Sequence, residues 1–496
     1  MVATAPSGPQ VPGAVARSPW GSRAITALGV AALALALRLV AGTGFANYDT
    51  LYGLLWGQQA AHGHTPTYRV PIAPTPHPLV EFVGVVLSPF GPRAMRDVTV
   101  ALGFLALAGC AVLVYRIGAL TFGRAAGLLA GVLLVSRAPV VSDGVRAYID
   151  VPYLLCVLAA LLVELRRRRA GASVLGLLAV AGLLRPEAWA FSGLYWLYLV
   201  PGRSRAELAR LALLAASAPL LWVASDLLVT GNPLWSLTHT RDDASALGRK
   251  TGIVNVPQYI PRRIGEILGA PELAGAALGG VLTLWWLRER ARLLAMVGVL
   301  AVAVFALFAS AGLPINTRYA FFAAAILCLF CGAGLFGWRW LPAGDHRRLP
   351  WMAASVLVGL AMIAFVPSQV RDLRSQLRTL ATQQAVADDL SRLVGQGLIS
   401  TRCLPVGVPN HAPVPLLALE LTTSPANVLS GDSEALGAGG TITRGTYVQP
   451  ADQQAMDYIL DRNDPATLAR HRPVPADFTL RGGNRSWRVY QRCDGS

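Results

Sequence analysis

The sequence predicts a mainly α-helical, polytopic membrane protein with a small C-terminal α/β domain outside the membrane. Hydrophobic residues make up 54% of the 496 residues and charged residues 14%, and the mean hydropathy is +0.49. A soluble chain of this length could not bury so much apolar surface in domains of ordinary size. Long apolar runs alternate with short arginine clusters, and beyond residue 367 Asp, Gln, Arg and Pro replace Leu and Ala.

About eleven apolar runs are candidate membrane spans, since a helix needs roughly 20 apolar residues to cross a bilayer. The runs lie near 24–41, 79–115 (one long or broken element), 125–141, 149–165, 172–184, 187–200, 208–230, 272–287, 293–311, 319–337 and 350–367. The two short runs that flank Arg185 could instead form a helical hairpin. Residues 1–20, rich in Pro, Gly, Ser and Ala, are expected to be a disordered cytoplasmic tail. We expect 21–367 to be the transmembrane domain and 368–496 the extracytoplasmic α/β domain.

Arginine placement predicts the orientation. Clusters such as Arg166–Arg169 fall in every second loop, as the positive-inside rule requires of cytoplasmic loops. Loops 42–78, 142–149, 185–187, 231–271 and 312–318, and the C-terminal domain, are then extracytoplasmic. The net charge of +16 follows from these loop arginines, so a nucleic-acid partner is not expected. Lys250 is the only lysine, a bias typical of a GC-rich bacterial genome, which suggests a bacterial plasma membrane.

The C-terminal region carries a helical pattern over 369–398 and strand-like pieces at 402–406 and 486–490. Cys403 and Cys493 lie in this region, whereas the other four cysteines lie in predicted spans. An oxidising compartment would allow these two cysteines to form a disulfide.

The predicted outer loops collect the residues that could carry chemistry. They hold Asp49, His77, Asp150, Arg185, Glu187, His239, Arg241 and Arg318. A carboxylate that takes a proton, arginines that bind a phosphate and a possible metal are what a reaction on an anionic, lipid-linked substrate requires.

Each of these residues also has a purely structural interpretation. Asp49 and Asp150 could cap the helices that follow them, and Arg185 with Glu187 could be a surface ion pair. The loop histidines could simply be solvated. Neither a His-Glu-x-x-His motif, a phosphate-binding loop nor a Rossmann glycine pattern stands out, so a nucleotide-driven pump has no support and a metal stays open.

The order and sidedness of several short motifs resemble the GT-C superfamily of integral-membrane glycosyltransferases. The resemblance is to its phospholipid carrier-dependent branch, related to protein O-mannosyltransferases and the aminoarabinose transferase of lipid A. It rests on Asp49-Thr-Leu-Tyr52, Gly57 to Gly63, His77-Pro78-Leu79, Gly91-Pro92-Arg93-Ala94, Asp150-Val151-Pro152, Leu183-Leu184-Arg185-Pro186-Glu187 and Arg318-Tyr319. These motifs cover roughly residues 24–340. The lysine common near the Pro-rich element of close relatives is absent, and His77 stands there.

The resemblance implies a GT-C-like transmembrane domain that transfers a sugar from a polyprenyl-phosphate donor, without a nucleotide and with inversion. Asp49 would be the general base, and Asp150 would position a substrate or share a divalent metal with His77. The lipid phosphate would contact Arg185, His239, Arg241 and Arg318, and Tyr48, Tyr52, His77 and Glu187 would line the substrate site. The acceptor could be a glycan, a lipid or a protein.

Two other function classes remain open from the sequence. A transporter or lipid flippase would also have many spans, but its ionisable residues should lie near the middle of the bilayer. A polymerase or ligase of another membrane fold, acting on a lipid-diphosphate oligosaccharide, would suit a large outer loop at 231–271. It would not account for Asp49 on the first outer loop.

Overall fold

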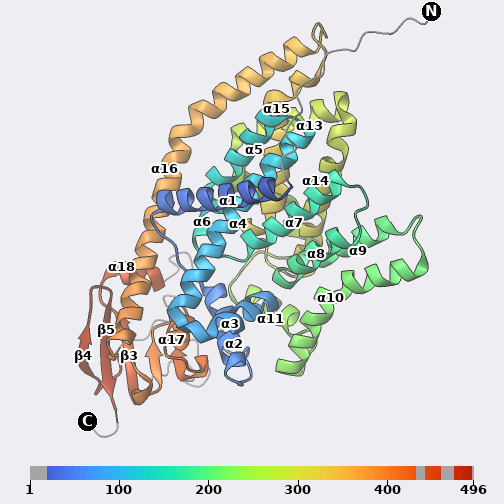
Figure 1. The fold of residues 1–496 in the computed structure, drawn as a ribbon. Helices are drawn as coiled ribbons and strands as arrows, with labels where there is room; N and C mark the ends of the chain where they lie inside the picture. The colour runs from blue at the N-terminus through green and yellow to red at the C-terminus, as the bar shows by residue number, and fades with distance from the viewer. Residues whose placement is uncertain (1–18, 432–441, 460–473, 494–496) are drawn as a thin grey trace, which may run out of the picture.

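The computed structural model describes residues 19–431, 442–459 and 474–493. The predicted tail, residues 1–20, therefore lies almost wholly outside the described residues. The described chain is mostly helical and ends in a five-stranded sheet, as predicted (Figure 1).

The first half of the chain forms helices α1 to α10. Their bounds are α1 Pro19–Ala41, α2 Tyr48–Ala61, α3 Pro78–Leu87, α4 Gly91–Thr121, α5 Arg124–Ser136, α6 Ala138–Val145, α7 Asp150–Arg166, α8 Ala172–Leu184, α9 Glu187–Leu199 and α10 Arg205–Thr230. Helices α8 and α9 have 13 residues each, about 20 Å, so each is too short to cross a hydrocarbon core of about 30 Å alone. They pack against each other as a hairpin with Arg185 at its tip.

The later helices lead to the sheet domain. They are α11 Trp235–Ala246, α12 Val256–Leu268, α13 Ala270–Trp286, α14 Arg288–Ser310, α15 Phe321–Phe336, α16 Arg348–Gly395, α17 Val414–Glu420 and α18 Gln453–Ile459, with a 3₁₀ turn, η3, at Thr317–Ala320. In the described part of the chain six helices are long and apolar enough to span a membrane, or up to eight if the bent pairs α5–α6 and α12–α13 each count as one span. The protein is therefore a multi-pass membrane protein. The expectation of about eleven spans remains a prediction.

Helix α16 connects the membrane region to the sheet domain without a loop. It has 48 residues and continues through Pro367, where the lost backbone N–H removes one helical hydrogen bond. Its first half exposes apolar side chains such as Leu357 and Ile363, as expected of a lipid-facing surface. Its second half buries Val386 and Leu390. The predicted domain boundary at 367/368 thus falls inside one helix.

The sheet has the strand order β2-β1-β3-β5-β4. Its strands are β1 Val406–Val408, β2 Val428–Ser430, β3 Gly445–Pro450, β4 Thr479–Gly483 and β5 Trp487–Arg492. β1 is parallel to β2 and β3, and the β3–β5 and β5–β4 pairs are antiparallel. A disulfide joins Cys403 to Cys493, with their Cα atoms 5.7 Å apart, so the last strand is tied to the segment before β1.

Helix α2 packs into the core of the sheet domain. Its buried residues Leu54 and Leu55 belong to one hydrophobic cluster with Leu390 of α16, Val406 of β1 and Leu417 of α17, and Figure 1 shows α2 close to α17. A partly buried ion pair at 2.7 Å between Arg96 of α4 and Glu420 strengthens the contact. The helix that carries Asp49 is therefore held by the C-terminal domain.

Candidate functional site

A cavity of about 570 Å³ brings together residues from distant parts of the chain. Its wall includes residues of α2, α7, α9, α10, α11, α14, η3 and the loop before α17. Among the predicted site residues, the lining contains Tyr48, Asp49, His77, Asp150, Arg185, Glu187, Arg241 and Arg318. Apolar side chains, including Leu307, Phe308 and Leu313, cover another part of the wall.

Asp49 lies in the first turn of α2, and a neighbouring residue caps that helix. The side-chain Oδ1 of Asn47 accepts hydrogen bonds from the backbone N–H of Asp49 at 2.8 Å and of Thr50 at 3.1 Å. Asn47 does what an N-cap residue does. Capping therefore does not occupy the carboxylate of Asp49, which faces the cavity.

The turn between α6 and α7 fixes the start of α2. The backbone N–H groups of Phe45 and Asn47 donate to the carbonyls of Val145 and Arg146 at 3.1 and 3.0 Å. Asn47 Nδ2 also donates to the Arg146 carbonyl at 2.9 Å, and the Thr50 hydroxyl donates to the Ala147 carbonyl at 2.8 Å. Since Asp150 follows this turn, the two acids are held in a fixed relation.

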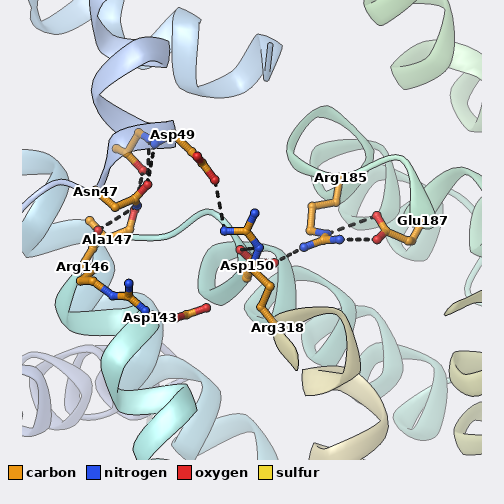
Figure 2. Close-up of polar contacts among 10 residues, drawn as sticks. Asn47, Asp49, Asp143, Arg146, Ala147, Asp150, Arg185, Glu187 and Arg318 are labelled. Carbon is orange, nitrogen blue, oxygen red and sulfur yellow. Dashed lines mark hydrogen bonds and ion pairs between the residues drawn. The ribbon is translucent and has the colours of Figure 1, made fainter. Parts of the chain in front are cut away.

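Two arginines link the three carboxylates of the site (Figure 2). Arg318 Nη1 donates to Asp49 Oδ2 at 3.1 Å, and Arg318 Nε lies 3.8 Å from Asp150 Oδ2. Arg185 contacts Asp150 Oδ1 through Nη1 and donates from Nε to Glu187 Oε2 at 3.2 Å. The cluster of Asp49, Asp150, Glu187, Arg185 and Arg318 thus carries one net negative charge when all five groups are ionised.

Most of the charged groups in this network are buried. Asp150, Arg185 and Glu187 are only 1%, 6% and 8% exposed. Buried charges are costly unless they are paired and hydrogen-bonded, and here each has at least one opposite charge in contact. The Arg185–Glu187 pair is therefore a buried ion pair inside the cavity wall rather than a surface salt bridge.

The remaining predicted residues divide between the cavity and its surroundings. Arg241 lines the cavity, and its Nε donates to the Ala311 carbonyl at 2.6 Å. His239 is not a lining residue: its ring stacks on Trp235, and its Nε2 lies 3.0 Å from the Ala73 carbonyl. Tyr48 lines the cavity, whereas Tyr52 is 1% exposed and packs behind it, with ring centroids 5.0 Å apart.

His77 precedes α3 and faces Trp222 across 5.6 Å between ring centroids. Burial lowers the pKa of His77 to about 4, so the imidazole is neutral at pH 7. A metal shared by His77 and Asp150 does not fit the residues present, because the carboxylate of Asp150 lies between two guanidinium groups. Among the described residues there is also no group of three or more side chains able to hold a metal ion.

Several cavity residues were not predicted from the sequence. Asp226 had a signal, because it is an acid inside a predicted span. Its carboxylate accepts hydrogen bonds from the Ser236 N–H at 2.9 Å and hydroxyl at 2.7 Å, which holds α11 against α10. Arg249 and His411 also line the cavity. His411 belongs to the sheet domain, and no local pattern in the sequence connects it with Asp49.

Comparison with known proteins gives a result only at the level of structure. No family model and no curated protein matches this chain. The structure is similar to that of ArnT from Cupriavidus metallidurans bound to undecaprenyl phosphate, with 16% sequence identity and a TM-score of 0.53 over 96% of this chain and 98% of that chain. ArnT in the apo state aligns with 15% identity and a TM-score of 0.49 over 95% and 98% of the chains.

The chain has the same fold as this ArnT. The predicted resemblance is thereby confirmed for the fold. Because 96% of the chain is covered, the similarity extends over the sheet domain as well as the membrane helices.

Proposed function

We propose that this protein transfers a sugar from a polyprenyl-phosphate donor to an extracytoplasmic acceptor hydroxyl, with Asp49 as the general base. The observation that carries the proposal is the carboxylate of Asp49, which lies in a cavity and is oriented by Arg318 at 3.1 Å. The solved ArnT of the same fold is bound to undecaprenyl phosphate, and a lipid of that class supplies a phosphate leaving group without a nucleotide.

In the proposed reaction Asp49 takes the proton of the acceptor hydroxyl. The acceptor oxygen forms a bond to the anomeric carbon while the bond from that carbon to the phosphate oxygen breaks, and the polyprenyl phosphate leaves with one more negative charge. Attack from the face opposite the phosphate inverts the anomeric configuration. A positioned base of this kind typically contributes about 10²–10⁴-fold to the rate.

The charges of the cavity support a position for the phosphate near α11. Arg185 and Arg318 are already paired with three carboxylates. Arg241 and Arg249 line the same cavity, and within the described residues neither has a carboxylate at salt-bridge distance. We call Arg241, Asp243 and Arg249 the α11 wall and propose that its two guanidinium groups bind the lipid phosphate, since arginine can offer a bidentate contact.

The apolar part of the cavity suits the lipid chain of the donor. Leu307 lines the cavity and is also 59% exposed on α14. Leu234, next to α11, shares both properties and is 53% exposed. Apolar side chains that face both a cavity and the surroundings of a membrane helix provide a route along which a polyprenyl chain can extend into the bilayer.

The experiment compares Asp49→Asn with the wild-type protein and with Asp97→Asn, an exposed acid on α4. Radiolabelled sugars on undecaprenyl phosphate serve as donors, and envelope from cells lacking the gene serves as the source of acceptor. We expect transfer by Asp49→Asn to fall about 10²-fold or more, with undecaprenyl phosphate binding retained and Asp97→Asn unaffected. Full activity of Asp49→Asn would refute the role of Asp49.

A further inference from the structure

Among the described residues of the sheet domain, the loop between β1 and α17 reaches the cavity. His411, between β1 and α17, lines the cavity beside Tyr48, with ring centroids 5.5 Å apart and ring planes at 81°. Tyr48 directly precedes Asp49 in the first turn of α2. A side chain 362 positions away in the sequence from Asp49 therefore forms part of the same wall.

The loop that carries His411 is held in place on both sides. Asn410 is 1% exposed and accepts a hydrogen bond from the Ala412 N–H at 3.1 Å. The carbonyl of His411 accepts from the Val414 N–H at 3.1 Å, where α17 begins. Because α17 shares its buried core with α2, His411 and Asp49 belong to one packed unit.

The electrostatic surroundings of His411 differ from those of Asp49. Burial raises the pKa of Asp243 on α11, and the charges of His239, Arg249 and His411 oppose that rise. His411 and the α11 wall line the same cavity. Two arginines face one carboxylate on this wall, whereas three carboxylates surround two arginines at Asp49, so an anion is favoured at the α11 wall.

We propose that His411 is a further phosphate-binding residue, contributed by the sheet domain to the α11 wall. Its imidazole N–H donates a hydrogen bond to an anionic oxygen of the lipid phosphate, in the same cavity as the guanidinium groups of Arg241 and Arg249. The donor site is then shared between the membrane region and the sheet domain. This inference rests on the proposed function, and it assigns the C-terminal domain a direct part in donor binding.

The contact also has a consequence for catalysis. As the bond to the anomeric carbon breaks, the phosphate gains negative charge, and a hydrogen bond to a charged oxygen is stronger than one to a neutral oxygen. A donor placed where charge develops stabilises the transition state more than the ground state. Loss of His411 should therefore reduce kcat as well as donor affinity.

The test measures binding of undecaprenyl phosphate to the full-length protein in detergent. The variants are His411→Ala, His411→Gln, which keeps an N–H donor, and His64→Ala as a control, because His64 is exposed and does not line the cavity. A hydrogen bond to a charged group contributes about 1.5–3 kcal/mol, so His411→Ala should weaken binding about tenfold to a hundredfold. His411→Gln should recover part of that loss, and His64→Ala should bind as the wild type does.

Two further ligands identify the chemistry that His411 recognises. Undecaprenol lacks the phosphate, and its binding should be unchanged by His411→Ala; an equal loss for both lipids would show that His411 contacts the chain and would overturn the proposal. Inorganic phosphate should bind much more weakly than the lipid. A site that binds inorganic phosphate through His411 but does not bind undecaprenyl phosphate would also overturn it.

The outcome separates this inference from the proposed function. If the wild-type protein does not bind undecaprenyl phosphate, the proposed function fails. If it binds and His411→Ala binds equally well, only the role of His411 fails. Should His411→Ala prove unstable, His411→Phe replaces it, because this variant keeps an aromatic ring against Tyr48 but has no N–H to donate. Wild-type affinity for undecaprenyl phosphate in a stably folded His411→Phe would overturn the role of His411.

Discussion

Asn47→Ala tests whether the start of α2 positions Asp49, the proposed general base. The substitution removes the acceptor for two backbone N–H groups, which typically costs about 1 kcal/mol (range 0.5–2) for an N-cap. It also removes two donations from Asn47 Nδ2, to Thr50 Oγ1 and to the Arg146 carbonyl, both at 2.9 Å. At about 0.5–1.5 kcal/mol for each hydrogen bond, the total destabilisation is about 2–4 kcal/mol.

The activity should fall by more than the loss of stability explains. When the cap is missing, the first turn of α2 frays, and the carboxylate of Asp49 shifts relative to Arg318 and the donor. A misplacement of about 1 Å can cost about 10²-fold in rate. We therefore expect kcat to fall by one to two orders of magnitude, on the order of the estimate for misplacement. The affinity for undecaprenyl phosphate should fall less, because Arg241 and Arg249 are not altered.

Ser204→Ala is the matched control, because Ser204 caps α10 at an exposed position by accepting from the Glu207 N–H at 3.2 Å. Thermal unfolding and the sugar-transfer assay are measured for both variants in the same detergent. Ser204→Ala should lower the Tm slightly and leave kcat intact. The reasoning is refuted if Asn47→Ala is destabilised as expected while its kcat, measured well below its Tm, matches that of Ser204→Ala.

Three other predictions follow from the buried charges and from the side of the membrane on which charged loops lie. Arg185→Met leaves two buried carboxylates without a cation, so it should destabilise the protein by about 3–5 kcal/mol and abolish transfer. Glu272→Gln breaks the buried pair with Arg137 at 2.8 Å and should lower the Tm but keep activity. Equal losses of activity in the two variants would contradict this expectation. The folded-state pKa of His77, about 4, lies below its unfolded value of about 6.5. The unfolded state therefore binds more protons between these values, so stability should drop by up to about 3 kcal/mol as the pH falls from about 6.5 to 4, and a Tm–pH curve of His77→Gln should be flatter there. In whole cells a membrane-impermeant thiol reagent should label Asp242→Cys but not Arg167→Cys, and labelling of Arg167→Cys from outside would reverse the orientation.

The sequence was sufficient to predict the fold class and to assign several charged residues of the cavity to one side of the membrane. Composition predicts a polytopic protein because a bilayer requires long apolar helices. Arginine placement assigns Asp49, Asp150, Arg185 and Arg318 to one side of the membrane, and these four residues line one cavity in the structure. Residues at the same face of the bilayer lie within a thin layer. A sequence pattern that assigns residues to one face therefore also limits the distance between them along the membrane normal.

The details of the site depended on contacts that sequence patterns do not report. From the sequence Asp49 could cap the helix that follows it, and only the structure shows that Asn47 accepts both N–H groups at the start of α2. It suggested that Arg185 binds phosphate, whereas the structure pairs Arg185 with two carboxylates. Which oppositely charged groups meet is determined by helix packing between segments far apart in the chain.

The domain boundary illustrates a second limit. Proline inside an apolar run commonly marks a helix end, because it lacks an N–H and disfavours helical geometry in the residue before it. Pro367 lies where the composition changes, and the last predicted span ends there because of that change. In the structure α16 continues past it, because the following turns bury Val386 and Leu390 in the sheet domain, and that tertiary packing outweighs one missing hydrogen bond.

The pairing of Arg318 suggests how negative charge moves during the proposed reaction. In the resting site Arg318 contacts Asp49 and lies near Asp150. When Asp49 takes the acceptor proton it becomes neutral, and the same negative charge appears on the leaving phosphate. The net charge of the cluster of three carboxylates and two arginines then changes from one negative charge to zero. The Arg318 guanidinium is therefore attracted less strongly to Asp49 and more strongly to the new charge on the phosphate. The total charge in the cavity stays the same, so no additional charge has to be buried during the chemical step. The unfavourable free energy of burying these ions arises when the protein folds and not during the reaction.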